Sequence, residues 1–262
     1  MKYFSTLFLS FLCCFLLPLT SQGQTTFSGH DSDEDGCIGT NDLLSILSVF
    51  GTCNAIFNCG DLVTHDGYDY STLQIGDQCW FSENCRYLPC VSTSSSSSTT
   101  TPYYYVYGYE GSDVPAAKAQ AVYDTFGVLY NWTAIMVDGI CPSGWHIPTD
   151  LEFQYMEMAL GMSEAEAGST GWRGTDQSVQ MRSTSGWEGE NNGTNSSGLN
   201  CLPAGYAYPG GFDLLGSFVG FWTSSSSSTS SAWRRYFGYS YDGVFRNPNS
   251  RSNSFSARCI QN

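Results

Sequence analysis

The sequence predicts an α+β fold made of one small and one large part. Three observations lead to this class. A few segments have helical amphipathic periodicity, many short strand-like runs rich in aromatic residues lie between turn residues, and no repeat with a period of 20 to 50 residues is present. The strand-like runs dominate from residue 171 onwards, where stretches such as NNGTNSSG and PAGYAYPGG separate them. The roughly 200 residues after position 57 are enough for a single core.

Residues 1–23 are predicted to be a signal peptide. Lys2 supplies a weak positive end, the run LFLSFLCCFLLPL is apolar but short for a bilayer, and SQG offers small residues before a cleavage site near Gly23. No lipid-attachment motif ends at Cys13 or Cys14, and no later segment reaches about 18 uninterrupted apolar residues. We therefore expect a secreted or cell-surface protein without membrane insertion.

The mature chain is strongly acidic. Loss of Lys2 from the 10 basic residues leaves 9 against 24 acidic residues, a net charge near −15. This balance argues against nucleic acid as a partner, because nucleic-acid affinity comes from Lys and Arg on phosphates. Charged residues are only 13 % of the chain, against about 25 % in an average domain. Such a surface is typical of ordinary secreted domains and also of surfaces that face sugars.

The cysteines fit an exported protein. Eleven cysteines less Cys13 and Cys14 leave nine, which are expected to be mostly paired in disulfides. Because nine is odd, one thiol is expected to be free or to pair outside the chain.

Residues 24–56 contain an acidic loop with the spacing of an EF-hand calcium site. Asp31 is position 1 of this loop, and Gly36 stands at position 6, where the sharp turn needs glycine. The predicted Ca²⁺ ligands, at positions 1, 3, 5, 7 and 12, are Asp31, Asp33, Asp35, the carbonyl of Cys37 and Asp42. Calcium binds six to eight hard oxygens, which this spacing gathers. The alternative interpretation is a solvated acidic linker.

A helix is predicted directly after the loop, over 42–50. Its apolar face would consist of Leu43, Leu44, Leu47 and Phe50. The stretch resembles the calcium repeat of dockerin modules, DxDxDGxIxxxD followed by LL. Dockerins use two such repeats to bind a cohesin partner, and only one is found here, so the resemblance implies calcium binding without a cohesin-type partner. A single extracellular loop is expected to bind calcium weakly, on the order of 10⁻⁴ to 10⁻³ M.

The loop and helix also suggest a disulfide. Cys37 would coordinate calcium through its main-chain carbonyl, which leaves its side chain available. Cys53 stands at the end of the predicted helix and is the nearest candidate, so we expect a Cys37–Cys53 bridge to close the unit.

Residues 57–262 are predicted to form the large domain, with two helices. The first lies within 112–124, with Asp113 as N-cap candidate and Pro115 in the first turn, and the second lies within 148–161, with Pro148 and Thr149 ahead of it and Gly161 just past its end. The serine-rich stretch 92–102 looks like a linker, but the strand-like run YYYVYGY follows it directly. We interpret it as a loop inside the domain.

The second helix carries acidic residues away from its apolar face. Phe153, Met156 and Leu160 form that face, and Glu152 and Glu157 lie off it. Both carboxylates are therefore expected to be solvated rather than to form an acid/base pair.

Five ordered stretches resemble a known family. They are YSTLQIGDQCWFSENCRYL, YDTFGVLYNWTAI, GICPSGWHIPTDLEF, the segment from TSGWEGENNGT to GFWTSS, and WRRYFGYSYDGVFRNPNSRSNSFSARCI. Together they look like the Fibrobacter succinogenes major paralogous domain over 57–262. This resemblance implies a family abundant in secreted proteins of Bacteroidetes and fibrobacters, and it implies no established activity.

A more distant similarity, to formylglycine-generating enzymes, concerns shape. GWHIPTDLEF, FWTSS and the closing SFSARC follow the same layout. The similarity implies a C-type-lectin-like domain of short twisted antiparallel sheets with two helices and long loops, and a disulfide between Cys141 and Cys259. Those enzymes act through a cysteine pair near the C-terminus. This chain has no cysteine between Trp233 and Arg258, so their chemistry is not expected here.

No catalytic constellation stands out. HExxH, GxSxG, P-loop and dinucleotide motifs are absent from the sequence, and His146 is expected to be a hydrogen-bonded structural histidine. Trp172 and Trp187 lie in Gly/Ser/Asn-rich loops and are tentative ligand-binding residues that would stack on sugar rings, although a buried tryptophan is the default. Four arginines are expected to brace loops: Arg234, Arg235, Arg246 and Arg251.

These observations predict a secreted, non-catalytic binding or adhesion module. Its ligand would be a polysaccharide, a protein or a cell surface, and calcium would stabilise its N-terminal unit. The alternatives are an enzyme of unknown type that uses the lectin-like cleft and a structural surface-coat protein.

Overall fold

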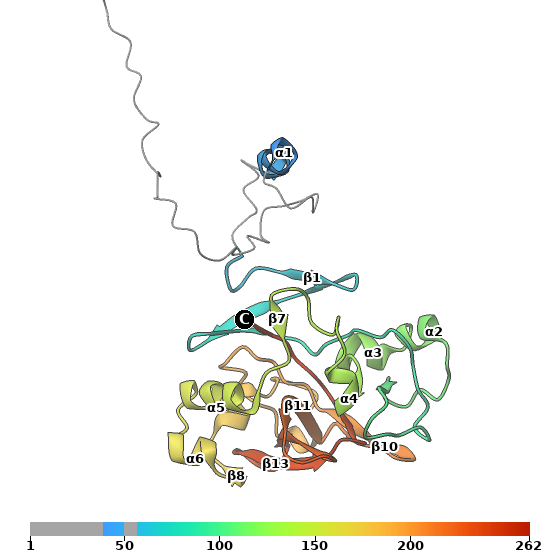
Figure 1. The fold of residues 1–262 in the computed structure, drawn as a ribbon. Coiled ribbons are helices and arrows are strands. Elements are labelled where there is room, and N and C mark those ends of the chain that lie inside the picture. The colour runs from blue at the N-terminus through green and yellow to red at the C-terminus, as the bar shows by residue number, and fades with distance from the viewer. Residues whose placement is uncertain (1–38, 50–56) are drawn as a thin grey trace, which may run out of the picture. The chain divides into compact units, whose positions relative to one another are not determined.

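The computed structural model describes residues 39–49 and 57–262 (Figure 1). The chain divides into two compact units, Met1–Ile56 and Phe57–Asn262. Several predictions lie outside the described residues: the signal peptide with its cleavage site, the Cys37–Cys53 bridge, and the calcium ligands Asp31, Asp33, Asp35 and Cys37.

The described part of the first unit is the helix α1 (Thr40–Val49). It starts two residues before the predicted helix. Asp42 stands in its first turn, where a carboxylate interacts favourably with the helix dipole, and its Oδ2 accepts the Gly39 N–H at 2.7 Å. Asp42 is buried, whereas Leu43 and Leu44 of the predicted apolar face are exposed.

The second unit is built around a nine-stranded sheet with the order β5-β6-β14-β9-β11-β12-β13-β8, with β10 paired to β9. Most of its pairs are antiparallel; β11 and β9 run parallel. The strands are β5 (Tyr104–Tyr105), β6 (Leu129–Asn131), β8 (Gly171–Arg173), β9 (Ala204–Tyr208), β10 (Gly211–Leu215), β11 (Phe218–Ser226), β12 (Ser231–Gly238), β13 (Val244–Ser250) and β14 (Ser254–Phe255).

Two smaller sheets complete the unit. One is the hairpin of β1 (Val63–His65) and β2 (Tyr68–Tyr70). The other has the order β3-β4-β15-β7, so the last strand of the chain pairs with strands from early and middle positions. Its strands are β3 (Thr72–Ile75), β4 (Gln78–Phe81), β7 (Trp145–His146) and β15 (Ile260–Gln261).

The helices of the second unit are short. They are α2 (Val114–Lys118), α3 (Ala121–Phe126), α4 (Trp132–Ile135), α5 (Asp150–Ala159), α6 (Glu164–Gly168) and α7 (Gln177–Met181), with one 3₁₀ turn, η1 (Glu188–Glu190). The single helix predicted over 112–124 is therefore wrong. It is two helices, because Gln120 has an extended backbone and starts a new helix. Asp113 is the N-cap residue of the first, without a side-chain cap bond.

The helix predicted within 148–161 is confirmed as α5, Asp150–Ala159. Its N-cap residue is Thr149, whose hydroxyl accepts the Glu152 N–H while the Glu152 carboxylate accepts the Thr149 N–H. This reciprocal capping box satisfies two main-chain donors that the helix cannot. The mixture of helices and sheets agrees with the α+β class. The run YYYVYGY contributes only the two residues of β5 to a sheet.

The serine-rich stretch belongs to the second unit, as predicted. Ser94 is buried, and its N–H and hydroxyl both donate to the carboxylate of Glu110. This contact fixes the loop to residues after it in the chain.

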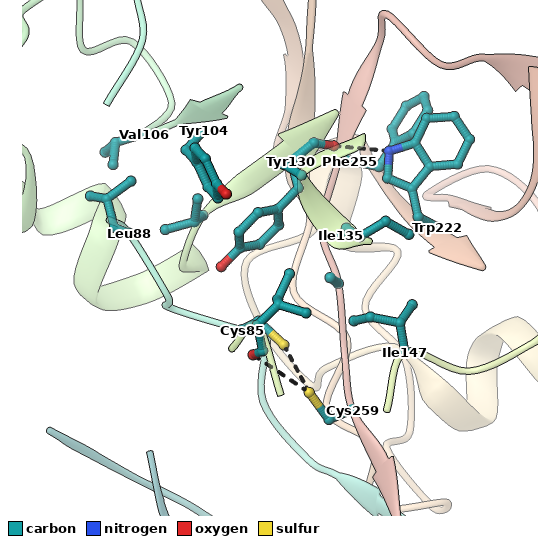
Figure 2. Packing of buried hydrophobic residues seen from close by; sticks show 14 of the residues in the cluster. Cys85, Leu88, Tyr104, Val106, Tyr130, Ile135, Ile147, Trp222, Phe255 and Cys259 are labelled. Carbon is teal, nitrogen blue, oxygen red and sulfur yellow. Dashed lines mark hydrogen bonds between the residues drawn. The ribbon is translucent and has the colours of Figure 1, made fainter. Parts of the chain in front are cut away.

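The two larger of three apolar clusters take alternate side chains of the long sheet. In the first, the indole N–H of Trp222 donates to the carbonyl of Tyr130 at 2.9 Å, and Trp222 packs on Phe255 (Figure 2). The second contains Phe221, the neighbour of Trp222 in β11, together with Phe237 of β12. Because side chains alternate along a strand, consecutive residues of β11 enter different clusters.

Two disulfides are present among the described residues, Cys59–Cys79 and Cys141–Cys259. The second is the pair that the lectin-like resemblance implies. It joins two residues 118 positions apart in the sequence, which corresponds to about 5 kcal/mol of stability in the chain-entropy model. Cys85 is one of three described cysteines with a free thiol, and its sulfur lies 3.5 Å from that of Cys259 (Figure 2).

The prediction of a solvated Glu157 is wrong. Glu157 is fully buried, with its carboxylate 2.8 Å from Arg235 Nε and 2.8 Å from Arg173 Nη1. Asp150, about two helical turns earlier in α5, forms ion pairs with Arg235 and Arg246, each at 2.6 Å. The reason is that three strands of the sheet direct arginines at α5, so the helix buries acidic positions as well as apolar ones. Arg235 thus braces a helix rather than a loop, whereas Arg246 braces α5 and also, through Nη1, the carbonyls of Gly168 and Ser169 at the end of α6.

Candidate ligand-binding surface

The register of three strands places aromatic side chains on one face of the sheet. Phe245 of β13 stands opposite both Trp172 of β8 and Tyr236 of β12. Directly opposed residues of antiparallel strands share a face, so these three rings lie side by side. The next residues in the same strands, Arg173 and Arg246, reach α5 instead. Because side chains alternate along a strand, the aromatic face is the one that α5 does not cover.

Seven rings form a continuous row that we call the aromatic strip. It consists of Tyr241, Trp172, Phe245, Tyr236, Phe218, Tyr206 and Tyr208. Neighbouring ring centroids lie between 4.0 Å (Trp172–Tyr241) and 5.9 Å (Tyr236–Phe245) apart. Phe218, in the middle, is buried, whereas Trp172, Tyr241 and Tyr208 at the two ends are exposed. The strip thus rests on the core and opens to solvent at both ends.

Trp172 is the predicted ligand residue that this surface presents. It is 37 % exposed, and its indole stacks on Tyr241 with the two planes 20° apart. Contacts with Tyr236 and Phe245 hold its other edges. An aromatic side chain that is both exposed and held by neighbours loses little conformational entropy when it binds a ligand.

The prediction that Trp187 stacks on a ligand is wrong. Trp187 is buried in the second apolar cluster, and its indole N–H lies within hydrogen-bond distance of the Ser183 hydroxyl and the Cys201 carbonyl. Arg182 covers the ring, 5.2 Å from its centroid. The loop that carries Trp187 folds back onto the core and satisfies its one polar group there, which is the usual state of a buried tryptophan.

Arg234 lies in the middle of the aromatic strip. Its guanidinium carbon stands 4.6 Å from the ring centroid of Phe255, 5.7 Å from that of Tyr236 and 5.8 Å from that of Phe218. Its Nε donates to Asn247 Oδ1 at 3.1 Å. Burial lowers the pKa of Arg234 to about 10, an effect that the Tyr236 and Tyr206 phenols partly oppose.

A polar pocket of about 580 Å³ forms elsewhere, where four parts of the chain, helix α3 among them, meet. Glu83, Arg86, Asp124, Asn200 and Arg258 contribute to its lining. Both guanidinium groups already donate to main-chain carbonyls, Arg86 to those of Tyr123 and Asp124 and Arg258 to that of Asn200 among others. The arginines therefore hold the walls of the pocket, and the space itself suits a small polar molecule. Sequence reasoning missed this pocket because its residues carry no shared motif.

His146 is hydrogen-bonded on both sides, as predicted. Its Nδ1 lies 2.6 Å from Asn262 Oδ1 and its Nε2 lies 2.9 Å from Glu152 Oε1. Burial alone would raise the pKa of Glu152, but hydrogen bonds from Thr149 and His146 hold it below its usual range. His146 thus ties the C-terminal residue to the start of α5.

Of the predicted calcium ligands, the structure describes only Asp42. Among the described residues, no three His, Cys, Asp or Glu side chains are grouped to hold a metal ion. In the same part of the chain no helix is long and apolar enough to span a membrane.

Comparisons with known proteins give one result. The model of the Fibrobacter succinogenes major domain matches residues 73–261. Neither the curated proteins nor the solved structures contain a match to the chain.

Proposed function

The chain belongs to the Fibrobacter succinogenes major domain family, and we propose that it is a secreted, non-catalytic module that binds polysaccharide through the aromatic strip. The observation that carries this proposal is the exposed stack of Trp172 on Tyr241 at the open end of the strip. A sugar ring presents an apolar face of C–H groups, which packs on an aromatic face, while its hydroxyls need hydrogen-bond partners around that face.

The strip supplies both kinds of contact. Clustered exposed aromatic residues on a soluble domain mark interaction surfaces. The phenol hydroxyls of Tyr206, Tyr208, Tyr236 and Tyr241 make no hydrogen bond to any described residue, so they are available to the hydroxyls of a sugar. This mixture of stacking surface and hydroxyls favours a glycan over a protein ligand, which would need a larger apolar area.

Two further features support export of the module. The disulfides Cys59–Cys79 and Cys141–Cys259 are consistent with a location outside the cytoplasm, where disulfides persist. The predicted signal peptide would direct the chain to export. We place the protein outside the cell or at its surface.

The fold proposed for the large domain is the C-type-lectin-like variant. The bridge from Cys141, before β7, to Cys259, before β15, supports it, because it joins the start of the α5 segment to the end of the chain as that resemblance implies. An experimental structure of the domain, compared with lectin-like folds, tests this assignment.

The N-terminal unit is proposed to bind Ca²⁺ through Asp31, Asp33, Asp35, the Cys37 carbonyl and Asp42. Asp42 is the one ligand of this set that the structure describes, and its position is compatible with the role: it is buried in the first turn of α1, and its Oδ2 accepts the Gly39 N–H. Carboxylate and carbonyl oxygens are the ligands that calcium prefers. The ion would cross-link the loop and stiffen it, and a single loop does not call for a cohesin-type partner.

A glycan array probed with and without calcium tests the proposal. We expect binding to at least one class of polysaccharide in both conditions, because the strip lies in the second unit and its rings do not depend on the calcium loop. Absence of binding to every glycan would contradict the proposal. Turnover of a screened substrate, lost on Glu83→Gln in the polar pocket, would favour the enzyme alternative instead.

A further inference from the structure

One of the eight arginines of the chain, Arg234, differs from the other seven in its hydrogen bonds, and this difference bears on the ligand. All eight lie in the described residues, and seven direct a terminal nitrogen (Nη1 or Nη2) at an oxygen of the protein. Those seven are Arg86, Arg173, Arg182, Arg235, Arg246, Arg251 and Arg258. Arg234 does not: within the part of the chain that the structure describes, its only hydrogen bond is from Nε, and it has no ion pair.

The position of Arg234 is costly for a charge without a counterion. Its guanidinium lies among the rings of Phe218, Tyr236 and Phe255, and the side chain is half-buried there. Cation–π contacts offset part of the cost of removing a guanidinium from water, but a neutral side chain would fill the same space without any cost. The fold itself therefore gains little from a positive charge at this position.

We propose that Arg234 makes the aromatic strip selective for acidic glycans, whose sugars carry a carboxylate or a sulfate group. This inference rests on the proposed function, since it assigns the ligand class of the same surface.

The geometry of Arg234 suits this role. The bond from Nε to Asn247 Oδ1 and the contact with the Phe255 ring fix the guanidinium plane. The edge of the guanidinium that carries Nη1 and Nη2 makes no hydrogen bond to a described residue, and neither nitrogen is fully buried. Two parallel N–H groups on a fixed edge match the two oxygens of a carboxylate or a sulfate. A sugar stacked on Tyr236 would bring a charged substituent to this edge.

The acidity of the whole chain does not oppose the inference at short range. The net charge is −14, so a polyanion is repelled at a distance. However, the titratable groups that act on the pKa of Arg234 are the phenols of Tyr236 and Tyr206, whereas Asp213, opposite Tyr206 in the β9–β10 pair, acts on Tyr206. At physiological salt the screening length is about 8 Å, so distant carboxylates contribute little at the site.

The test uses pairs of glycans that differ only in charge. Calorimetric titrations of the full mature chain at about 0.15 M salt compare oligogalacturonate with its methyl ester, and a sulfated galactan oligosaccharide with its desulfated form. We expect the wild type to bind one of the charged forms at least about tenfold more tightly than its neutral partner, as is usual for a hydrogen bond to a charged group. The pair that shows the preference tells carboxylate from sulfate.

Variants then assign the preference to Arg234. Arg234→Gln is expected to lose the preference for the charged glycan, while its affinity for the neutral glycan stays within about twofold of the wild type. Arg234→Lys keeps the positive charge but not the two parallel N–H groups, so it is expected to retain only part of the preference. Arg251→Gln is the control, because Arg251 already bonds Ser226 and Ser228 beside Trp132.

Three outcomes contradict the inference in distinguishable ways. If the wild type binds charged and neutral forms equally, selectivity is absent although the proposed function stands. If the preference survives Arg234→Gln in a variant that melts like the wild type, another group reads the charge. If none of the titrated glycans binds and no glycan on a broad array binds either, the proposed function is wrong, and this inference fails with it.

Discussion

The indole of Trp172 lies on the phenol of Tyr241 with ring centroids 4.0 Å apart, and both rings are exposed. Two stacked rings at the open end of an aromatic row are more than a packing contact. An exposed pair keeps a large apolar area in water, which costs free energy unless a ligand covers it. This relationship is the basis of the predictions about binding.

Removal of Tyr241 is expected to weaken binding without unfolding the domain. Tyr241→Ala takes away the ring that orients Trp172, so the affinity for a bound glycan should fall about three- to tenfold, because aromatic pairs contribute about 0.5 to 1.5 kcal/mol. The free energy of unfolding should change by less than about 1 kcal/mol, as for most exposed positions. Affinity electrophoresis and thermal melting measure the two effects. An unchanged affinity would show that Tyr241 takes no part.

The buried ion pairs under α5 are expected to govern stability. Glu157→Gln leaves the guanidinium groups of Arg173 and Arg235 without their carboxylate, so the free energy of unfolding should fall by about 3 to 5 kcal/mol. Glu164→Gln, at an exposed position in α6, is the matched control and should change it by less than about 0.5 kcal/mol. Urea unfolding of both variants decides this. Equal effects would mean that the network does not stabilise the fold.

Stability is also expected to fall at acidic pH through Asp150. Burial alone would raise the pKa of this carboxyl, but hydrogen bonds from Arg246 and the charge of Arg235 hold it below the ordinary value of 3.8. A group whose pKa is lower in the folded state contributes stability above its unfolded pKa, and the contribution is lost as the pH falls through the folded pKa. At pH values below about 4 the melting temperature of the wild type should therefore fall. For Asp150→Asn the fall, measured from the variant's own melting temperature at pH 7, should be smaller. Identical pH profiles would contradict the assignment.

The free thiols are expected to differ sharply in reactivity. Burial raises the pKa of Cys85 to about 12 and that of Cys201 to about 11, whereas Cys90 is exposed. Since the thiolate is the reactive form, iodoacetamide at pH 8 should label Cys90 and should reach Cys85 and Cys201 only after denaturation. Mass spectrometry of peptides from native and denatured samples gives the comparison. Rapid native labelling of Cys85 would show that its surroundings open.

Calcium is expected to bind the N-terminal loop weakly. Titration calorimetry of the full mature chain should show a dissociation constant on the order of 10⁻⁴ to 10⁻³ M. Asp31→Ala should abolish the heat, because position 1 supplies a coordinating carboxylate, while Asp77→Ala in the turn after β3 should not. No calcium uptake by the wild type would leave the acidic loop as a solvated linker.

Local signals in the sequence were enough to predict where α5 lies, but they did not predict which of its side chains are buried. Thr149 followed three residues later by Glu152 is a capping box that the chain forms by itself, and the helix starts where that pattern predicts. Burial of Glu157 depends instead on Arg173 and Arg235, which are 16 and 78 residues away and reach it only once the sheet has assembled. No helical periodicity contains that information.

The candidate site shows the same limit. Trp172 and Trp187 stand in similar polar loops, and the sequence treats them alike. The pairing of β8 with β13 puts Trp172 on the open face, whereas the loop around Trp187 closes over it. Arg234 and its neighbour Arg235 likewise look equivalent in the chain, but strand alternation sends one to the aromatic strip and the other to Asp150.

The measurement that tests the central claim most directly is a titration of Trp172→Ala against Tyr155→Ala with a glycan that the wild type binds. Both residues are exposed aromatics, but Tyr155 lies on α5, on the other side of the sheet. We expect Trp172→Ala to lose at least about fivefold in affinity, since one stacking aromatic ring contributes about 1 to 3 kcal/mol by alanine substitution, while Tyr155→Ala binds like the wild type. Equal affinities of the two variants would contradict the claim that the aromatic strip is the binding surface.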